Sequence, residues 1–398
     1  MSRLDFDALV SGGGIAGATA AALLARGGRR VGLVDPKPPE GSLPEDDFDP
    51  RVVAISPGSA RILAAAGAWQ RLDAGRMAAF DVMSVHSGRQ STTFRASDHG
   101  LEALGWIVEI PALRQALWRA LEHDENLTLL APGTVETLDT DPKRARVKTD
   151  QGRTIHAGLV VAADGARSPL RRMAGIEVDT WHYNQNAIVA PVTNERSNRG
   201  VAWQRFTEHG PLALLPLADG RSSIVWSVPS GVSESLLALD EAGFVEALNE
   251  HQDSPFGPVL QAGTRHALPL VRRRAQRLVQ GRLVLLGDAA RSVHPLAGQG
   301  MNLGLADAAA LAEALEATGS DNDPGPALAH YERWRLSAGS LISDGIHGIN
   351  EIAHTPGSLG RGLLGLGFGV ASRLWPLRQA FVEHACGIDS DSPRLARP

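Results

Sequence analysis

Three glycines near the start of the chain have the spacing of a phosphate-binding turn. Gly12, Gly14 and Gly17 form the pattern G-x-G-x-x-G between a predicted strand and a helix that begins at Ile15. The first glycine permits a tight turn, the second lets backbone amides approach a pyrophosphate, and the third lets the helix pack closely on the strand. Asp35 closes the next predicted strand, where it can bond an adenosine ribose but disfavours a 2′-phosphate. The pattern predicts a site for FAD or NAD rather than for NADP.

A second glycine-rich segment has the composition of an anion site. Residues 287–290 read Gly-Asp-Ala-Ala after a predicted strand, and Gly298 and Gly300 precede a long Ala/Leu helix. Backbone amides at such a helix start would stabilise the negative charge that reduced flavin develops at its pyrimidine edge. Asp288 could accept a hydrogen bond from a ribityl hydroxyl. The alternative interpretation is an ordinary strand-to-helix turn, with His294 as an ordinary loop histidine.

Three further polar residues have both a structural and a cofactor-binding interpretation. Arg51 follows a loop from Pro36 to Pro50 that is rich in Pro, Gly, Asp and Glu, and on its own it fits a surface role. Arg114 lies in an amphipathic helix predicted from Pro111 to Glu122. Asp164 ends a buried apolar strand, and on its own it fits a turn.

The elements around these residues predict an α/β protein. A strand, a helix and a second strand form a βαβ start. Three further strands are expected to form an antiparallel β insertion, at Thr128–Thr137, Arg144–Thr149 and Gly152–Val161. Extended segments from Asn184 to Val228 predict a mostly antiparallel sheet suited to the wall of a pocket, and one helix from Leu236 to Glu250 is expected after it.

Composition excludes several classes of function. The net charge of −5 is spread along the chain without a basic patch, so we expect no nucleic-acid partner. Cys386 is the only cysteine, which excludes a disulfide framework, a thiolate zinc site and paired redox cysteines. The N-terminus lacks the apolar stretch of a signal peptide. The apolar run Leu363–Ser372 is bracketed by Arg361 and Arg373, well short of the ~20 residues that cross a bilayer. We expect a cytoplasmic protein.

Together these motifs resemble the FAD-dependent aromatic hydroxylases whose founding member acts on p-hydroxybenzoate, and the resemblance covers nearly the whole chain in order. Within that superfamily, three runs look like the ubiquinone-biosynthesis hydroxylase branch: Asp49–Ile55, Gly210–Leu217 and Gly287–Asp307. Three motifs in register are far more specific than any one of them. The chain departs from the branch pattern at Arg291, where His is frequent, and at Ile110, where Asn is common.

The resemblance implies which residues hold FAD. The implied cofactor-binding residues are Gly12, Gly14, Ile15, Ala16, Gly17, Asp35, Arg51, Arg114, Val135, Asp164, Gly165, Gly287, Asp288, Gly300, Met301 and Asn302. Nicotinamide cofactor is implied to pass near Asp164 and Gly165. The isoalloxazine ring, where dioxygen and substrate meet, is expected beside the catalytic candidates Pro295, Gly298, Gln299 and Gly300.

The activity implied by the resemblance is aromatic hydroxylation. NAD(P)H would reduce FAD, dioxygen would add at flavin C4a, and the hydroperoxide would transfer OH to a polyprenylated phenol or quinone precursor of ubiquinone. A single G-x-G-x-x-G favours a transiently bound reductant, and we expect no metal in the reaction. The alternatives are a hydroxylase of a soluble aromatic compound or secondary metabolite, and a flavin-binding scaffold subunit without turnover. With only Tyr183 and Tyr331 in the chain, a tyrosine-rich carboxylate site is disfavoured.

Length and composition predict two closely packed domains and a helical end. The 398 residues, 43% of them hydrophobic, can bury a large core but are too many for one. We expect a Rossmann-like FAD-binding domain, an inserted, mostly antiparallel β-sheet substrate domain and a C-terminal helical region. Their predicted bounds are 1–75, 100–178 and 265–345 for the first, 76–99 and 179–264 for the second, and 346–398 for the third.

The region from Leu341 to Gly387 is helical, rich in Leu and Gly, and open to two interpretations. It could be a hydrophobic helix hairpin that covers the core. It could also be an interfacial surface that delivers a membrane-resident, prenylated substrate, with peripheral contact at the inner membrane face or within a ubiquinone-biosynthesis complex. Homo-oligomerisation is left open.

Overall fold

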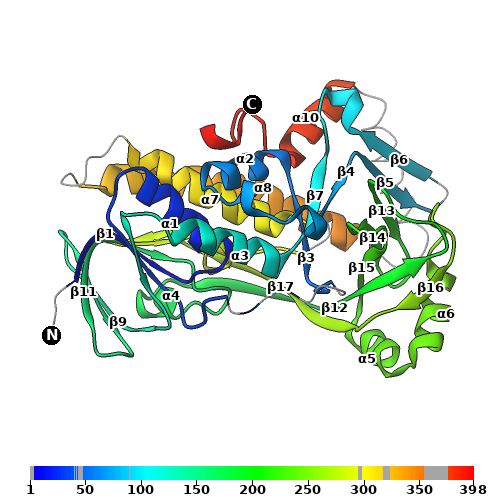
Figure 1. Ribbon diagram of the computed structural model, residues 1–398, viewed down its shortest axis with the longest axis horizontal. Coiled ribbons are helices and arrows are strands. Elements are labelled where there is room, and N and C mark those ends of the chain that lie inside the picture. The colour runs from blue at the N-terminus through cyan, green and yellow to red at the C-terminus, as the bar shows by residue number, and fades with distance from the viewer. Residues whose placement is uncertain are drawn as a thin grey trace.

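The computed structural model describes residues 4–39, 41, 43, 48–88, 90–294, 298–316, 323–353 and 375–398. The described elements form an elongated molecule (Figure 1). One end holds a first sheet with helices on one of its faces, and the other end holds a second sheet. A small third sheet lies between them.

The first sheet has a parallel centre that fits the βαβ start. Its strands run in the order β18-β19-β11-β1-β2-β8, and β1 (Leu4–Ser11) is parallel to both β2 (Val31–Val34) and β11 (Thr154–Ala162). Every residue of β2 is buried, as expected for a parallel strand covered on both faces. The other strands are β8 (Leu127–Leu130), β9 (Val135–Thr140), β10 (Ala145–Thr149), β18 (Val279–Gln280) and β19 (Leu283–Leu285).

The single strand predicted over Thr128–Thr137 was wrong, because this segment forms two strands in different parts of the first sheet. β8 pairs parallel with β2 and extends the centre, whereas β9 pairs antiparallel with β10. Pro132 lies between them and has no backbone N–H to donate to a ladder, so strand pairing stops there. The antiparallel β insertion therefore consists of β9, β10 and the start of β11.

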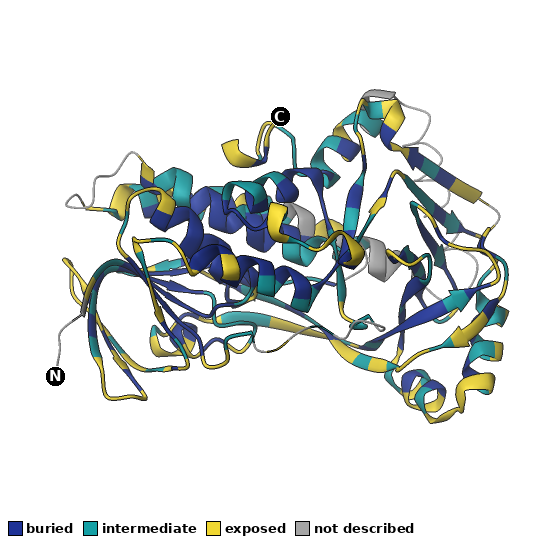
Figure 2. Cartoon of the chain, viewed as in Figure 1, coloured by how far each residue is buried: buried dark blue, intermediate teal, exposed yellow. Residues whose placement is uncertain are grey.

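Helices cover one face of the first sheet, and their contact faces are among the most deeply buried parts of the molecule (Figure 2). Leu113, Leu117 and Leu121 are all buried, in agreement with the amphipathic helix predicted there. None of the described helices is both long and apolar enough to cross a membrane. The helices are α1 (Ile15–Arg26), α3 (Ile110–Leu121), α7 (Gln299–Glu316) and α8 (Gly325–Ala353), and the short α4 (Pro169–Met173) follows β11.

The second sheet is mostly antiparallel, as the extended segments predict. Its order is β20-β17-β12-β15-β14-β13-β5-β6, with β16 beside β12, and β13 runs parallel to β5. Trp203 and Trp226 are buried in its core. Its strands are β5 (Val82–Ser87), β6 (Gln90–Arg95), β12 (Val178–Asn194), β13 (Val201–Phe206), β14 (Pro211–Pro216), β15 (Ser222–Pro229), β16 (Val259–Ala262), β17 (His266–Ala275) and β20 (Arg291–Ser292).

Two features of this region differ from the sequence expectation. The helix predicted from Leu236 to Glu250 is two helices, α5 (Ser230–Ala238) and α6 (Glu241–His251). Asp240 starts the second one, since its carboxylate accepts a hydrogen bond from the amide of Gly243 at 2.8 Å, as an N-cap does. β17, in the stretch expected to return to the first domain, still pairs with β12 of the second sheet, and the first sheet resumes at β18.

The third sheet joins the two larger ones and has the order β3-β7-β4. Its strands are β3 (Val52–Ile55), β4 (Met77–Phe80) and β7 (Gly105–Glu109). Two helices lie near it, α2 (Pro57–Ala65), which follows β3, and α10 (Trp375–Ala385). The short 3-10 helices are η1 (Trp69–Arg71), η2 (Ala74–Arg76), η3 (Ala96–His99), η4 (Gly287–Ala289) and η6 (Arg394–Ala396).

Candidate functional site

The turn after β1 has the geometry that its glycines predict. Gly12 has a φ of +105°, and a Cβ there would lie 2.3 Å from the carbonyl oxygen of Ala163. A Cβ on Gly17 would lie 1.9 Å from the carbonyl oxygen of Gly12, so α1 can pack here only without a side chain. At Gly14 the space is open, because no described atom lies within 4 Å of the Cβ position. Gly14 also gives α1 no side-chain cap, which leaves the amides of its first turn able to bind an anion.

Asp35 is held beside this turn at the end of β2. Its buried carboxylate accepts hydrogen bonds from the amides of Gly13 at 2.5 Å and Lys37 at 2.8 Å. Arg114 donates to the same carboxylate at 3.0 Å, and its Nε donates to the carbonyl oxygen of Gly13 at 3.1 Å. Helix α3 therefore brings Arg114 to the glycine turn after β1, where its guanidinium holds the carboxylate of Asp35 in place.

Asp164 and Gly165 also lie at this turn, just after β11. The Cβ position of Gly12 is 2.9 Å from the amide nitrogen of Asp164. Oδ2 of Asp164 accepts from the amide of Leu170 at 3.0 Å, whereas Oδ1 is buried and has no partner among the described residues. Burial raises the pKa of Asp164 in spite of hydrogen bonds from Ser168 and Leu170. A buried acceptor without a partner fits a hydrogen-bond donor on a ligand.

The second glycine motif is anchored by a buried ion-pair network around Asp307. The amide of Gly287 donates to Oδ2 of Asp307 at 3.2 Å, and Arg291 donates to both oxygens at 2.9 Å. Arg335 of α8 donates its Nε to Oδ1 at 2.7 Å. All three charged side chains are buried. The network fixes the turn at η4 to α7 and α8, and it explains how an arginine is accommodated at position 291.

The two glycine motifs, far apart in sequence, meet at α1. The Cβ of Ala16 lies 3.0 Å from the Cβ position of Gly287 and 3.2 Å from that of Gly304. Close packing of α1 on η4 and α7 thus depends on the two glycines. One extended ligand can therefore contact both motifs.

The start of α7 is bound to the end of β3 by Asn302. Its Nδ2 donates to the carbonyl oxygens of Ala54 at 3.0 Å and Gly298 at 3.2 Å. Its Oδ1 accepts from the amide of Ser56 at 3.1 Å. Gly298 has a φ of +61°, and a Cβ there would lie 3.1 Å from the Cβ of Ala54. The predicted segment is therefore fixed against β3 through one amide side chain.

A cavity of about 370 Å³ opens beside this segment. Gly298, Gln299, Gly300, Met301 and Asn302 all lie in its wall, together with the exposed Asp288. Among the described wall residues there is no Lys, Arg, His or Tyr. Much of the apolar wall comes from Val52, Phe80, Met83, Phe94, Leu104, Ile107, Ile110, Ala202, Trp203, Ala213, Leu215, Val225, Phe381 and Val382.

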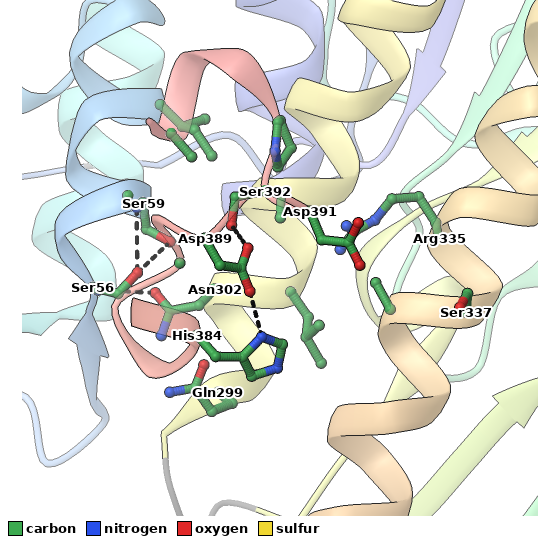
Figure 3. A pocket seen from close by; sticks show the side chains of 18 residues that line it. Ser56, Ser59, Gln299, Asn302, Arg335, Ser337, His384, Asp389, Asp391 and Ser392 are labelled. Atoms are coloured by element: carbon green, nitrogen blue, oxygen red, sulfur yellow. Dashed lines mark hydrogen bonds and ion pairs between the residues drawn. The ribbon is translucent and has the colours of Figure 1, made fainter. Parts of the chain in front are cut away.

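A smaller cavity of about 80 Å³ adjoins the first (Figure 3). Ser56, Gln299 and Asn302 line both. Part of its wall comes from the residues at and after the end of α10, where Nδ1 of His384 lies 2.5 Å from Oδ2 of Asp389. The hydroxyl of Ser392 donates to the other oxygen of Asp389 at 2.7 Å, which holds this segment in a turn against α7.

The same C-terminal residues pack on α2. The amide of Gly58 donates to the carbonyl oxygen of Cys386 at 2.9 Å, and a Cβ on Gly58 would lie 2.1 Å from the carbonyl oxygen of Gly387. Cys386 lines the large cavity, and burial raises the pKa of its thiol to about 12. The described end of the C-terminal region is thus part of the site. The apolar run Leu363–Ser372 lies outside the described residues.

Two predicted site residues, Arg51 and Val135, line neither of the two cavities. Arg51 has 54% of its side chain exposed and donates to Asp49 through Nε at 2.9 Å. Val135, at the start of β9, is partly buried and packs against the hydrophobic core of the first sheet and its helices. Pro295 lies outside the described residues. Contact of Arg51 and Val135 with a cofactor stays a prediction.

Two supporting residues were not singled out from the sequence. Trp118 donates its Nε1 to the carbonyl oxygen of Gly13 at 2.8 Å, and Asp307 holds the network described above. A signal existed for both. Trp118 lies four residues after Arg114 on the same helix face, and Asp307 ends the motif that begins at Gly287.

Comparison with known proteins agrees with this geometry. Residues 5–344 match a family model described as FAD binding domain. Ubiquinone hydroxylase UbiL of Rhodospirillum rubrum is 38% identical over 402 residues, which cover 98% of this chain and 92% of that protein. The 3-demethoxyubiquinol 3-hydroxylase of Escherichia coli is 34% identical over 352 residues, with 87% and 89% covered. The crystal structure of p-nitrophenol 4-monooxygenase PnpA from Pseudomonas putida shares the fold, with a TM-score of 0.76, 19% identity, and 97% and 99% covered.

Proposed function

Since the chain belongs to the FAD binding domain family, we propose that it is an FAD-dependent monooxygenase acting on the aromatic ring of a prenylated phenol or quinone precursor of ubiquinone. NAD(P)H and dioxygen are the proposed co-substrates. Two relatives that align with most of the chain are named as hydroxylases of ubiquinone or demethoxyubiquinol, which supports this substrate class.

The wall of the large cavity is the observation that carries the substrate class. A soluble aromatic acid binds best where a cationic side chain meets its carboxylate, and the described wall offers no Lys, Arg or His; its hydroxyls come from Ser56 and Ser227. A neutral ring with a prenyl tail would bury its surface against Phe80, Phe94 and Trp203, at about 25 cal/mol for each Å² of apolar area. The cavity therefore favours a neutral, hydrophobic phenol over an aromatic acid.

The two glycine motifs are the proposed binding site of FAD. The open space at Gly14 and the first turn of α1 suit the pyrophosphate, Asp35 suits the ribose, and the partnerless Oδ1 of Asp164 suits a hydroxyl donor. Bound FAD would supply hydride acceptance from NAD(P)H and the activation of dioxygen. The amides at the start of α7 would stabilise negative charge at the cavity, and the apolar wall would keep water out.

Delivery of such a substrate is proposed to occur at α10. Phe381 lines the cavity although half of the residue is exposed, so the cavity wall reaches the surface at this helix. The ring of Phe94 lies 5.6 Å from that of Phe381 and continues the apolar surface inward. A prenyl tail could pass between a membrane surface and the cavity here, by peripheral contact.

The test is a flavin reduction assay with product analysis. FAD-loaded protein is mixed anaerobically with NADH or NADPH, with and without a short-chain prenylphenol, and the bleaching of flavin absorbance is followed. The reaction is then repeated under isotopically heavy dioxygen and the phenol is analysed by mass spectrometry. We expect the prenylphenol to accelerate bleaching and to gain one heavy oxygen, and p-hydroxybenzoate to do neither.

Two other outcomes would contradict the proposal. Hydroxylation of p-hydroxybenzoate without reaction of the prenylphenol would make the chain a hydroxylase of soluble aromatic compounds. Flavin that is bound but not reduced under any of these conditions would make it a scaffold without turnover.

A further inference from the structure

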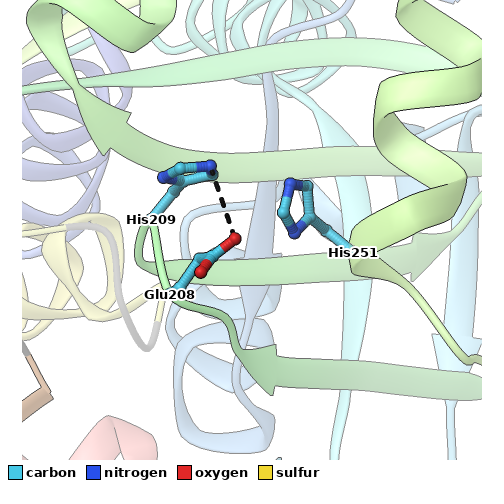
Figure 4. A group of neighbouring side chains, drawn as sticks. All are labelled: Glu208, His209 and His251. Atoms are coloured by element: carbon cyan, nitrogen blue, oxygen red, sulfur yellow. Dashed lines mark ion pairs between the residues drawn. The ribbon is translucent and has the colours of Figure 1, made fainter. Parts of the chain in front are cut away.

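Two histidines and a glutamate gather on the second sheet, outside the large cavity (Figure 4). Glu208 and His209 lie in the turn between β13 and β14, and His251 is the last residue of α6. One ligand atom from each lies within 4.8 Å of the others. Within the described ranges of the chain, this is the one group of three or more His, Cys, Asp or Glu side chains that meets this spacing.

Both histidines are carried by well-anchored backbone. In the turn, the hydroxyl of Thr207 donates to the carbonyl oxygen of Gly210 at 2.7 Å and accepts from the amide of His209 at 3.2 Å. Helix α6 is fixed to the core of the second sheet by Phe244 and Leu248, which are fully buried. The positions of the two backbone segments are therefore set without any bound ion.

The two imidazole rings are also packed. Their centroids are 4.9 Å apart at an interplanar angle of 72°, and the ring of His251 lies 5.2 Å from that of the buried Trp226. Nε2 of His209 is 3.9 Å from a carboxylate oxygen of Glu208, which is long for a hydrogen bond. The three side chains thus share a space without bonding one another closely.

We propose that Glu208, His209 and His251 bind a divalent transition metal of the zinc class, with water completing the coordination. Two imidazole nitrogens and one carboxylate oxygen are ligands that Zn²⁺ accepts, and a tetrahedral site places them roughly 3.4 Å apart. Because the present spacing is at most 4.8 Å, side-chain rotation has to close it by no more than about 1.4 Å. The side chain of Glu208 is 66% exposed and can rotate into place.

Neighbouring charge does not oppose a cation strongly. Arg205 of β13 is close enough to influence His251, but its guanidinium is paired with Asp253 at 2.6 Å. Glu250 adds negative charge beside the group. A bound ion would join the β13–β14 turn to α6 and so brace the strands that carry Trp203, Gln204, Pro211, Ala213 and Leu215 into the cavity wall.

The experiment uses FAD-loaded protein that has been treated with a chelator and then freed of it. Zn²⁺ is titrated by calorimetry, and Co²⁺ is titrated by visible absorption because a low-symmetry Co²⁺ site absorbs there. We expect one equivalent per chain and a rise in the melting temperature on addition of Zn²⁺. His209→Gln and His251→Gln should each weaken Zn²⁺ binding at least about tenfold, and Glu208→Gln should weaken it less.

Two control variants separate this site from other histidines. His123→Gln and His330→Gln change exposed histidines, so neither should alter Zn²⁺ affinity. FAD content checks that every variant is folded. Absence of Zn²⁺ binding by the wild type, or affinity unchanged by both His209→Gln and His251→Gln, would overturn the proposal.

A measurement on the wild type alone covers the case in which a variant fails to fold. Hydrogen exchange followed by mass spectrometry should show that Zn²⁺ slows exchange in the peptides that contain residues 207–210 and 247–251. Slower exchange elsewhere but not in these peptides would place the ion at another site and refute the assignment.

Discussion

The glycine turn after β1 and the large cavity are proposed parts of one site, but they are built in opposite ways. In the turn, main-chain contacts admit a single residue type, since a Cβ on Gly12 or Gly17 would lie 2.3 Å or 1.9 Å from a carbonyl oxygen. The cavity wall is made of side chains that come from positions as distant as Val52 and Cys386. Many apolar residues can fill such a wall if volume is kept. Cofactor binding therefore leaves a short sequence signature, whereas substrate binding leaves almost none.

The largest effect is expected at Asp307, whose buried ion pairs anchor the second glycine motif. Asp307→Ala would leave Arg291 and Arg335 buried without their shared carboxylate, which costs about 3–5 kcal/mol in the free energy of unfolding. Urea denaturation measures this loss. Asp49→Asn is the matched control, because its partner Arg51 is 54% exposed and the pair is worth less than about 1 kcal/mol. Equal losses in the two variants would contradict the role given to burial.

Gly14→Val sharpens the comparison by separating cofactor binding from folding. No described atom lies within 4 Å of the Cβ position, so the fold should survive while the valine fills the space proposed for the pyrophosphate. We expect FAD affinity to fall at least about 100-fold, or about 2.7 kcal/mol. Fluorescence titration with FAD measures the affinity. Gly231→Val in α5, where the space is equally open, should leave FAD binding unchanged.

Ala213→Phe tests the role of the large cavity by reducing its volume. Position 213 lies in the apolar wall, so the larger side chain should take up volume proposed for the prenylated substrate. We expect kcat/KM for a prenylphenol to fall about tenfold, or about 1.4 kcal/mol, with FAD content unchanged. Steady-state NAD(P)H oxidation measures it. A variant that loses FAD instead would show that the two halves are not separable.

The smallest effect concerns the C-terminal segment and depends on pH. Burial alone would raise the pKa of Asp389, but hydrogen bonds from Ser392 and His384 outweigh it and hold the pKa below its ordinary value of 3.8. A lowered pKa contributes stability above pH 3.8 that is lost as the pH falls through the folded-state pKa. Asp389→Asn should therefore cost at most about 1 kcal/mol at neutral pH. In thermal unfolding measured across the acid range, the difference from wild type should disappear at the lowest pH.

Sequence reasoning predicted the backbone geometry of the two glycine motifs. Gly12 and Gly17 make the close approaches that the turn motif predicts, and Gly12, Gly287 and Gly298 have positive φ angles. Asp35 closes its strand as expected because βαβ connections are short and their periodicity is clear. The fold class follows from the same local patterns.

The rest depends on contacts between distant segments. Arg335 could not be placed in the site from the sequence, because a charge in a helix is normally solvated; the burial of Arg335 and Asp307 follows from how α7 and α8 pack. Phe381 and Phe94 form one stretch of wall only because α10 lies beside β6. The break between α5 and α6, by contrast, could have been predicted from the sequence, because Asp240 is a typical N-cap residue.

The packing of residues 384–396 on α2 has a consequence for the order of events during synthesis. Arg61 donates to the carbonyl oxygen of Ala396 at 3.1 Å, across a separation of 335 residues. At about 5–20 residues per second, a ribosome needs on the order of half a minute to make that stretch. The segments proposed to bind the adenosine end of FAD are therefore made well before those proposed to enclose its flavin end. The described site can therefore be complete only after translation has ended.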